Sequence, residues 1–128
     1  MKSKKSKKQL LKAKADKLAG DLVRARGECQ ASGKDSVVCK GNLQWCHIIG
    51  RSNHRLRWEM WNALCMCQAH HLYYTHRPEE WLLDFIPNNF KSEWLEIMTH
   101  RQEIWDKDLG KVISALENTK PPDADELL

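Results

Sequence analysis

The sequence predicts an α+β fold: a small strand, loop, strand, helix core with a zinc-stapled knuckle, flanked by N-terminal and C-terminal helices. Its 128 residues fit one domain. Near both ends apolar residues recur at spacings of three and four, the pattern of amphipathic helices. The 48 residues from Cys29 to His76 hold all five cysteines and five of the six histidines. Because the first residues lack the apolar core of a secretory signal, this clustering favours metal ligands over a disulfide framework.

The N-terminal half is expected to form a helix, a loop and a strand. Leucines and a valine between lysines indicate an amphipathic helix over residues 9–26, which ends near Gly27. Residues 29–41 are rich in Ser, Gly, Asp and Lys around two cysteines, so we expect a knuckle-like loop there. A first strand follows over residues 43–49, and the turn-forming residues 50–53 end it.

The C-terminal half is expected to be mainly helical. A second strand is predicted over residues 55–58, followed by a helix over residues 63–74 that stops before Pro78. Pro78 opens another short helix, which Pro87 ends. The apolar spacing then predicts one continuous last helix over residues 90–117.

Charge is concentrated at the N-terminus. Residues 1–26 hold ten Lys or Arg residues and two acidic residues, so they carry +8 in a chain whose net charge is +4. We expect a disordered basic arm over residues 1–8, a folded domain over residues 9–118 and an acidic tail over residues 119–128. The basic arm is expected either to bind a polyanion such as nucleic acid or to serve as a solubilising end. No apolar run approaches the ~20 residues of a membrane span, so we expect no membrane association and a cytoplasmic location.

A structural zinc site is predicted within the Cys-rich region. Three sulfurs and one imidazole suit tetrahedral zinc and would attach the knuckle to the following helix. The expected ligands are Cys29, Cys39, Cys67 and His70. Cys46 is a rival for Cys39 as the fourth ligand, and buried free thiols are the alternative interpretation of the whole set. Cys65 is interpreted as a core residue.

Three stretches around these ligands carry a second set of polar residues. Asn62 lies fifteen positions after His47, and His71 lies nine positions after Asn62. The stretches are WCHIIGR at 45–51, RLRWEMWN at 55–62 and ALCMCQAHH at 63–71. Together they resemble the His-Asn-His (HNH) endonuclease family with its ββα-metal fold, especially its small bacteriophage members, over roughly residues 20–86.

The resemblance implies catalytic roles that suit the chemistry of phosphodiester hydrolysis. His47, at the end of the first strand, is the expected general base, because a neutral imidazole can remove a proton from water. By resemblance, Asn62 holds the loop that bears this base, and His71 binds a single catalytic divalent metal ion. His76 can join that metal only if the helix frays before Pro78, since five residues correspond to about 500° of helical rotation.

Three arginines and one cysteine complete the expected site. Arg51, Arg55 and Arg57 flank the base and offer paired guanidinium donors to phosphate oxygens. Cys46 stands where the resembled family often has a metal-binding Asp or His. A thiolate is a poor ligand for Mg²⁺ but an acceptable one for Zn²⁺, Ni²⁺ or Co²⁺. Either backbone groups and waters fill the missing coordination, or Cys46 shifts the metal preference. Mg²⁺, Mn²⁺, Ni²⁺, Co²⁺ and Zn²⁺ are therefore all candidate cofactors.

The expected function is a metal-dependent DNA endonuclease that nicks one strand or cuts both, with low intrinsic specificity. The resemblance to small phage enzymes also implies action beside a terminase during genome packaging, in the cytoplasm of the host cell. Two alternatives remain open: a catalytically silent, zinc-stapled DNA-binding module, and a recombination nuclease that acts on branched DNA. The oligomeric state is also open, because the Trp-rich C-terminal region leaves apolar positions that a dimer would cover.

Overall fold

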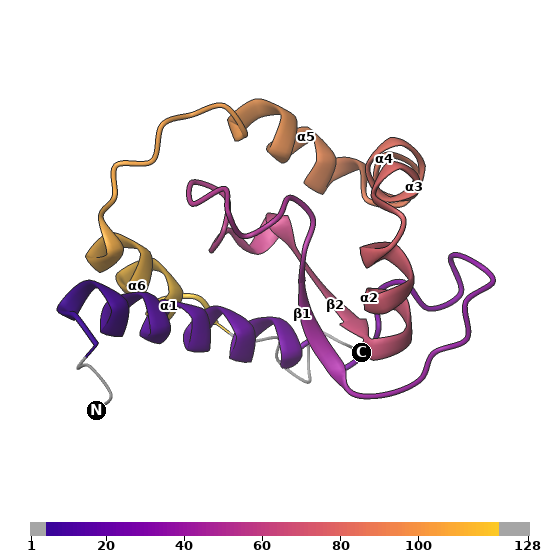
Figure 1. The fold of residues 1–128 in the computed structure, drawn as a ribbon, viewed down its shortest axis with the longest axis horizontal. Helices are drawn as coiled ribbons and strands as arrows, with labels where there is room; N and C mark the ends of the chain where they lie inside the picture. The colour runs from indigo at the N-terminus through magenta and orange to yellow at the C-terminus, as the bar shows by residue number, and fades with distance from the viewer. Residues whose placement is uncertain (1–4, 121–128) are drawn as a thin grey trace.

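The computed structural model describes residues 5–120, in which helices surround a small two-stranded sheet (Figure 1). The elements in chain order are α1 (Lys7–Arg24), β1 (Leu43–His47), a 3₁₀ turn (Met60–Asn62), β2 (Ala63–Cys67), α2 (Gln68–Thr75), α3 (Pro78–Glu80), a π-helical turn (Trp81–Phe85), α4 (Ile86–Asn89), α5 (Lys91–His100) and α6 (Leu109–Glu117). This mixture of helices and a small sheet confirms the α+β prediction.

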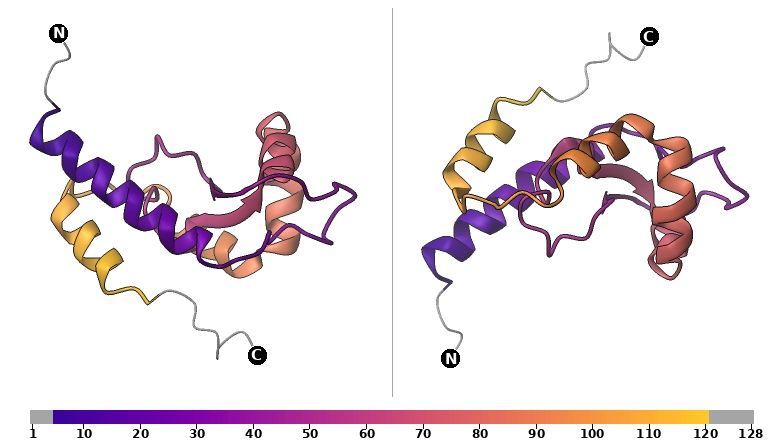
Figure 2. Two further views of the ribbon diagram at one scale, coloured as in Figure 1. Left: turned by 90° about the horizontal axis from the view of Figure 1, so that it is seen from below. Right: turned by 90° about the horizontal axis from the view of Figure 1, so that it is seen from above.

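The sheet is antiparallel and is covered on both faces. Trp45 of β1 pairs with Cys65 of β2, and both pack toward Val23 of α1. Their neighbours Cys46 and Leu64, which also pair, lie in the main hydrophobic core with residues of α2 to α5. Since side chains alternate along a strand, α1 covers one face of the sheet and α2 to α5 cover the other. Helix α6 lies beside α1 (Figure 2).

Helix α1 begins two residues before the predicted start. Ser6 caps it: its hydroxyl accepts from the Gln9 backbone N–H, and the Gln9 side chain accepts from the Ser6 backbone N–H. Residues 7 and 8, assigned to a disordered arm, are therefore helical, whereas residues 1–4 of that arm lie outside the described residues. The helix ends at Arg24, and the predicted stop near Gly27 corresponds to a positive φ of 82°.

The second strand was predicted at the wrong place. Residues 55–58 form turns, and β2 occupies Ala63–Cys67, where the sequence predicted the start of a helix. All five residues of β2 are buried. A short apolar run that is buried on both faces lacks strand alternation and cannot be distinguished from a buried helix by periodicity. Helix α2 consequently begins at Gln68, not at residue 63.

The predicted C-terminal helices also differ from the structure. Pro87 does not end its helix, because α4 continues to Asn89 after the π-helical turn. The last predicted helix is divided into α5 and α6 by residues 101–108. Asp108 caps α6 by accepting from the Lys111 backbone N–H. Helix α5 buries Ile97 in the main core, whereas α6 packs on α1, so one straight helix could not make both contacts.

Candidate metal centre and cleft

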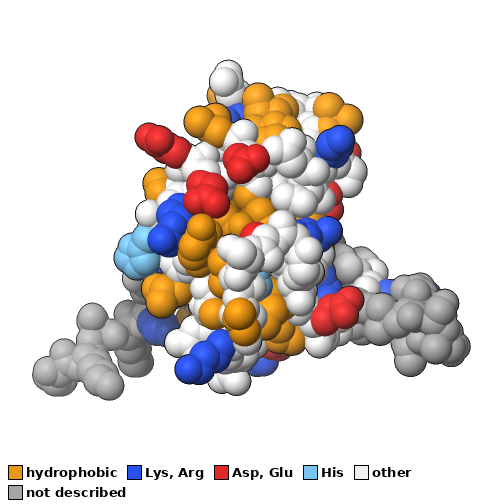
Figure 3. Space-filling model, turned by 90° about the vertical axis from the view of Figure 1, so that its right-hand side faces the viewer, with side chains coloured by type: hydrophobic (Ala, Val, Ile, Leu, Met, Phe, Trp, Pro, Cys, Tyr) orange, Lys and Arg blue, Asp and Glu red, His pale blue; other side chains and the backbone are white. Residues whose placement is uncertain are grey.

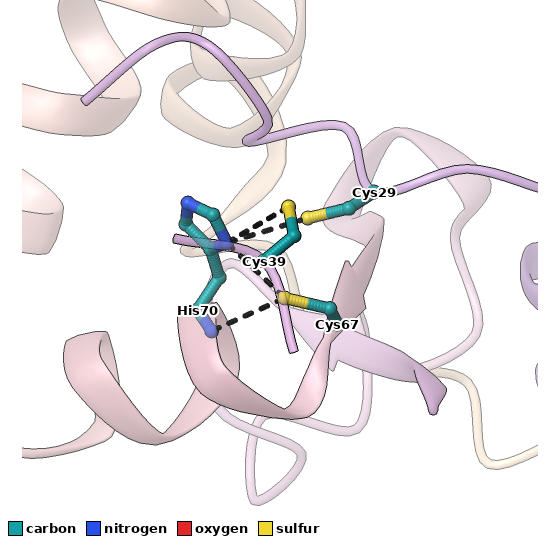
Figure 4. Close-up of side chains that lie close together, drawn as sticks. All are labelled: Cys29, Cys39, Cys67 and His70. Atoms are coloured by element: carbon teal, nitrogen blue, oxygen red, sulfur yellow. Dashed lines mark hydrogen bonds between the residues drawn. The ribbon is translucent and has the colours of Figure 1, made fainter. Parts of the chain in front are cut away.

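Three sulfur atoms and one imidazole nitrogen converge between the knuckle and the start of α2 (Figure 4). The ligand atoms of Cys29, Cys39, Cys67 and His70 all lie within 4.8 Å of one another, close enough to hold one metal ion. The distances from His70 Nδ1 are 3.6 Å to the Sγ atoms of Cys29 and Cys39 and 3.2 Å to the Sγ of Cys67. These are the four residues that the sequence predicted as a structural metal site.

The fold brings these ligands together from distant parts of the chain. Cys67 ends β2 and caps α2, where its Sγ accepts from the His70 backbone N–H at 3.5 Å. Cys29 and Cys39 come from the knuckle, whose backbone is tied to the core strand by the hydrogen bond from Gln30 N–H to the Cys65 carbonyl. The choice between Cys39 and Cys46 falls to Cys39, because Cys46 is not in the cluster. Cys65 is buried in the core, as predicted.

Asp35, in the knuckle, orients the imidazole of His70. The Nε2–H of His70 donates to Asp35 Oδ1 at 2.9 Å, and Tyr74 donates its hydroxyl to Asp35 Oδ2 at 2.6 Å. This hydrogen bond leaves Nδ1 directed at the three sulfurs, and a carboxylate in this position is a common partner of metal-binding histidines. Asp35 was not among the predicted site residues, although an acidic residue between two ligand cysteines was an available signal.

The titration behaviour of the cluster favours cation binding. Burial opposes ionisation of Cys67, but hydrogen bonds from the His70 backbone and side chain lower the pKa of Cys67 to about 6. Burial raises the pKa of Cys29 to about 11. Of these two thiols Cys67 is therefore the more readily ionised, and a bound cation would favour deprotonation of Cys29.

A cleft of about 590 Å³ lies on the side of the sheet that α1 covers, between α1, the end of β1 and the first turns of α2. Both His47 and His71 line it, together with Asp16, Lys17, Trp45, Gly50, Arg51 and Arg57. The structure thus brings the two histidines of the predicted catalytic set to one cavity.

His47 is held at the end of β1 in a defined orientation. Its Nε2–H donates to the Arg57 carbonyl oxygen at 3.1 Å, which leaves Nδ1 as the unprotonated nitrogen. The indole of Trp45 lies beside the imidazole, with ring centroids 4.3 Å apart. Burial lowers the pKa of His47 to about 4, so the ring is neutral at physiological pH. A neutral imidazole with one free nitrogen is able to accept a proton from water.

His71 is oriented in a similar way from α2. Its Nδ1–H donates to Gln44 Oε1 of β1 at 2.7 Å, which leaves Nε2 free to bind a cation. Burial lowers the pKa of His71, which also favours the neutral form that a metal ion requires. Gln44 could not be predicted from the sequence, because its contact with His71 depends on how α2 packs against β1.

Asn62 holds the loop that follows His47. It is fully buried, and its Oδ1 accepts from the Ile49 backbone N–H at 2.8 Å. Its Nδ2 donates to the carbonyl oxygens of Ile49 at 3.0 Å and Leu56 at 3.1 Å. The predicted side-chain hydrogen bonds from Asn62 to the loop backbone are therefore present.

The three predicted phosphate-binding arginines have different surroundings. Arg51 is exposed and lines the cleft. Arg57 also lines it, but its side chain is only 10% exposed and its guanidinium forms a bidentate ion pair with Asp16. Arg55 does not line the cleft, and its guanidinium pairs with Glu59 and Glu103. Arg51 is thus the predicted arginine best placed to meet a phosphate in the cleft.

Cys46 and His76 do not reach the cleft. Cys46 precedes His47 in β1, so its side chain points to the opposite face and is buried in the main core, where burial raises its pKa to about 12. The expected shift of metal preference by a Cys46 thiolate therefore loses its structural basis. Helix α2 extends without fraying to Thr75, and His76 is exposed outside the cleft.

The face that carries the knuckle and α3 is not a basic surface. Lys and Arg side chains there are dispersed among hydrophobic and acidic ones (Figure 3). In contrast, exposed lysines at positions 7, 8, 14 and 17 follow α1, and Lys17 also lines the cleft. Among the described residues, no helix is both long and apolar enough to cross a membrane.

Comparisons with known proteins leave the family open. No family model matches the chain, and neither a characterised protein nor a solved structure is significantly similar to it. The resemblance to HNH endonucleases therefore stays a prediction, which rests on the residues and their geometry.

Proposed function

We propose that this protein is a metal-dependent DNA endonuclease of the HNH type that hydrolyses phosphodiester bonds. One observation carries the proposal: a single cleft contains two neutral histidines, each with one ring nitrogen hydrogen-bonded and the other free of hydrogen bonds within residues 5–120. These are His47, with Nδ1 free, and His71, with Nε2 free. The order of β1, β2 and α2 supports an assignment of this region to a ββα-metal core.

The residues of the cleft divide the reaction between them. His47 Nδ1 accepts a proton from the attacking water, and the Arg57 carbonyl keeps the ring in the required tautomer. Arg51 binds a non-bridging phosphate oxygen, while Asn62 keeps the loop that carries Arg51 in place. A divalent cation held by His71 would stabilise the negative charge that develops on the leaving oxygen.

The cleft fits a catalytic cation only in part. Within residues 5–120, the Cys3His cluster is the only group of three or more His, Cys or carboxylate side chains close enough to bind one ion, so His71 would be the main protein donor. Phosphate oxygens of the DNA and water would then complete the coordination, as is common for Mg²⁺ at phosphate sites. We expect the cation to bind tightly only with DNA present, and Mg²⁺, Mn²⁺, Co²⁺, Ni²⁺ and Zn²⁺ remain candidates.

The Cys3His cluster is proposed to hold structural zinc. Zn–S and Zn–N bonds of about 2.3 and 2.0 Å at tetrahedral angles place sulfur and nitrogen about 3.5 Å apart. The distances from His70 Nδ1 to two of the three sulfurs are 3.6 Å. A site with four protein ligands leaves no position for substrate, which supports a structural role.

A plasmid-nicking assay tests the proposed function. Purified protein with its zinc content measured is incubated with supercoiled plasmid and each of the five cations. We expect nicked or linear DNA with the wild type, and a loss of at least about 100-fold in rate for His47→Ala and His71→Ala. His76→Ala is the matched control, because His76 is an exposed histidine outside the cleft and should leave the rate unchanged. Intact plasmid with every cation would refute the endonuclease.

The small number of metal donors in the cleft favours one alternative, a catalytically silent DNA-binding module. This module would bind DNA in a salt-dependent manner through the lysines of α1, with an affinity that His47→Ala leaves unchanged.

Four-way junctions and linear duplexes, tested side by side, separate the branched-DNA nuclease from a general endonuclease. Co-purification with a phage terminase would test the proposed packaging role.

A further inference from the structure

Asp16 of α1 connects the N-terminal helix to the loop beside His47. Its Oδ2 accepts from Arg57 Nη2 at 2.7 Å and its Oδ1 from Arg57 Nε at 3.1 Å. The indole N–H of Trp58 donates to the same Oδ1 at 2.8 Å. One carboxylate from α1 therefore fixes two consecutive residues that lie 41 and 42 positions further along the chain.

These contacts lead directly to the imidazole of His47. The backbone carbonyl of Arg57 accepts the Nε2–H of His47 at 3.1 Å. The Nη1 of Arg57 also donates to the Arg51 carbonyl at 3.3 Å. The guanidinium of Arg57 thus contacts Asp16 of α1 and the backbone of Arg51, while its carbonyl contacts His47.

The loop depends on such side-chain anchors. Residues 48–59 form turns and bends, in which backbone hydrogen bonds hold the carbonyl groups of Gly50, Asn53 and Leu56, while the Arg57 carbonyl accepts from the side chain of His47. Asn62 anchors the loop at Ile49 and Leu56. Without Asp16, the buried guanidinium of Arg57 would lose this ionic partner and would have to move toward water.

We infer that Asp16 is a positioning residue for the general base: it holds Arg57 so that the Arg57 carbonyl fixes the ring of His47. The catalytic consequence rests on the proposed function, but the positioning itself does not. Asp16 is poorly suited to be a metal ligand, because both of its oxygens already accept hydrogen bonds from Arg57 and Trp58.

NMR of the zinc-loaded protein tests the positioning without any reaction. We expect the wild type to show an exchange-protected Nε2–H resonance of His47, identified by its loss in His47→Ala. In Asp16→Asn, an amide group faces the Arg57 guanidinium, and this resonance should broaden or disappear. Asp21→Asn is the matched control, because Asp21 forms ion pairs on the same helix at an exposed position. An unchanged resonance in a folded Asp16→Asn protein would overturn the inference.

Kinetics provide the second readout. For Asp16→Asn we expect kcat for nicking to fall roughly tenfold or more while KM changes little, because the cleft keeps Arg51. Arg57→Lys, which retains a charge but not the bidentate geometry, should give the same two changes, and it supplies the test if Asp16→Asn does not fold. If the double variant with Asp16→Asn and Arg57→Lys nicks DNA no more slowly than Arg57→Lys alone, this supports action of Asp16 through Arg57. If the two losses of rate multiply, as for independent residues, the inference is overturned.

The two proposals can fail separately. If His47→Ala nicks DNA like the wild type while Asp16→Asn loses the Nε2–H resonance, the proposed function is wrong and the positioning stands. If the wild type binds the cation and Asp16→Asn does not, while the His47 resonance is unchanged, then Asp16 is a metal ligand and the inference is overturned.

Discussion

Replacing Cys39 by serine should release the knuckle from the rest of the domain. Cys39 is exposed and contributes one sulfur to the cluster. The knuckle has no strand or helix of its own, and a shared metal ion would add a cross-link to its hydrogen bonds with β2 and α2. Serine removes the thiolate but changes the side-chain volume little, and the other three ligands stay in place.

The magnitude follows from the size of the closed loop. Residues 29–39 form a loop of 11 residues, and the chain-entropy relation for cross-links gives about 3 kcal/mol for a loop of this length at 25 °C. Since domains of this kind are stable by about 5 to 15 kcal/mol, the loss is a large fraction of the free energy of unfolding. With urea m-values of about 1 to 3 kcal/mol/M, the unfolding midpoint should fall by roughly 1 to 3 M.

Urea unfolding followed by circular dichroism measures this change, together with zinc content per chain. Val38→Ala is the control, because Val38 is the exposed neighbour of Cys39 and makes no ligand contact. A wild type that binds no metal, or equal unfolding midpoints for Cys39→Ser and Val38→Ala, would refute the reasoning.

Three further predictions concern the cleft. Gln44→Ala should weaken cation binding in the presence of DNA by about 10- to 100-fold, measured by titration of nicking against cation concentration, because His71 loses its orienting partner. Asn62→Ala should lower the free energy of unfolding by about 2 to 4 kcal/mol in urea, since three backbone groups lose a buried partner. Because burial lowers the pKa of His47 to about 4 in the folded protein, below the ordinary value of 6.5, the unfolded chain binds more protons between these pH values. Stability should therefore fall as pH drops from 6.5 to 4, and His47→Ala should flatten that slope in pH-dependent unfolding; an equal slope in both proteins would contradict the assigned burial.

Local sequence patterns were sufficient for several features. The amphipathic spacing located α1 to within two residues, because a helix in contact with one surface repeats its apolar residues every three to four positions. The Cys67-x2-His70 pair marked the start of α2 as a ligand site, and its two knuckle partners were also predicted. The adjacency of Cys46 and His47 on a strand was enough to place them on opposite faces, an inference that the sequence analysis did not draw.

Contacts between residues distant in the sequence decided the position of β2 and the division between α5 and α6. The position of β2 depends on pairing with β1, because a fully buried five-residue run has no periodicity of its own. The division between α5 and α6 depends on two different packing partners.

Residue types and their spacing predicted the four residues of the Cys3His cluster and, through the family resemblance, His47 and His71 of the cleft. Asp16 and Lys17 join the cleft only in the folded structure. Only the tertiary structure decided which nitrogen of each histidine is free. That choice depends on the Arg57 carbonyl for His47 and on Gln44 for His71, and in turn on Asp16, 41 residues before Arg57. A hydrogen bond between distant segments leaves no trace in local periodicity, because it is fixed by how the elements pack and not by the order of neighbouring residues.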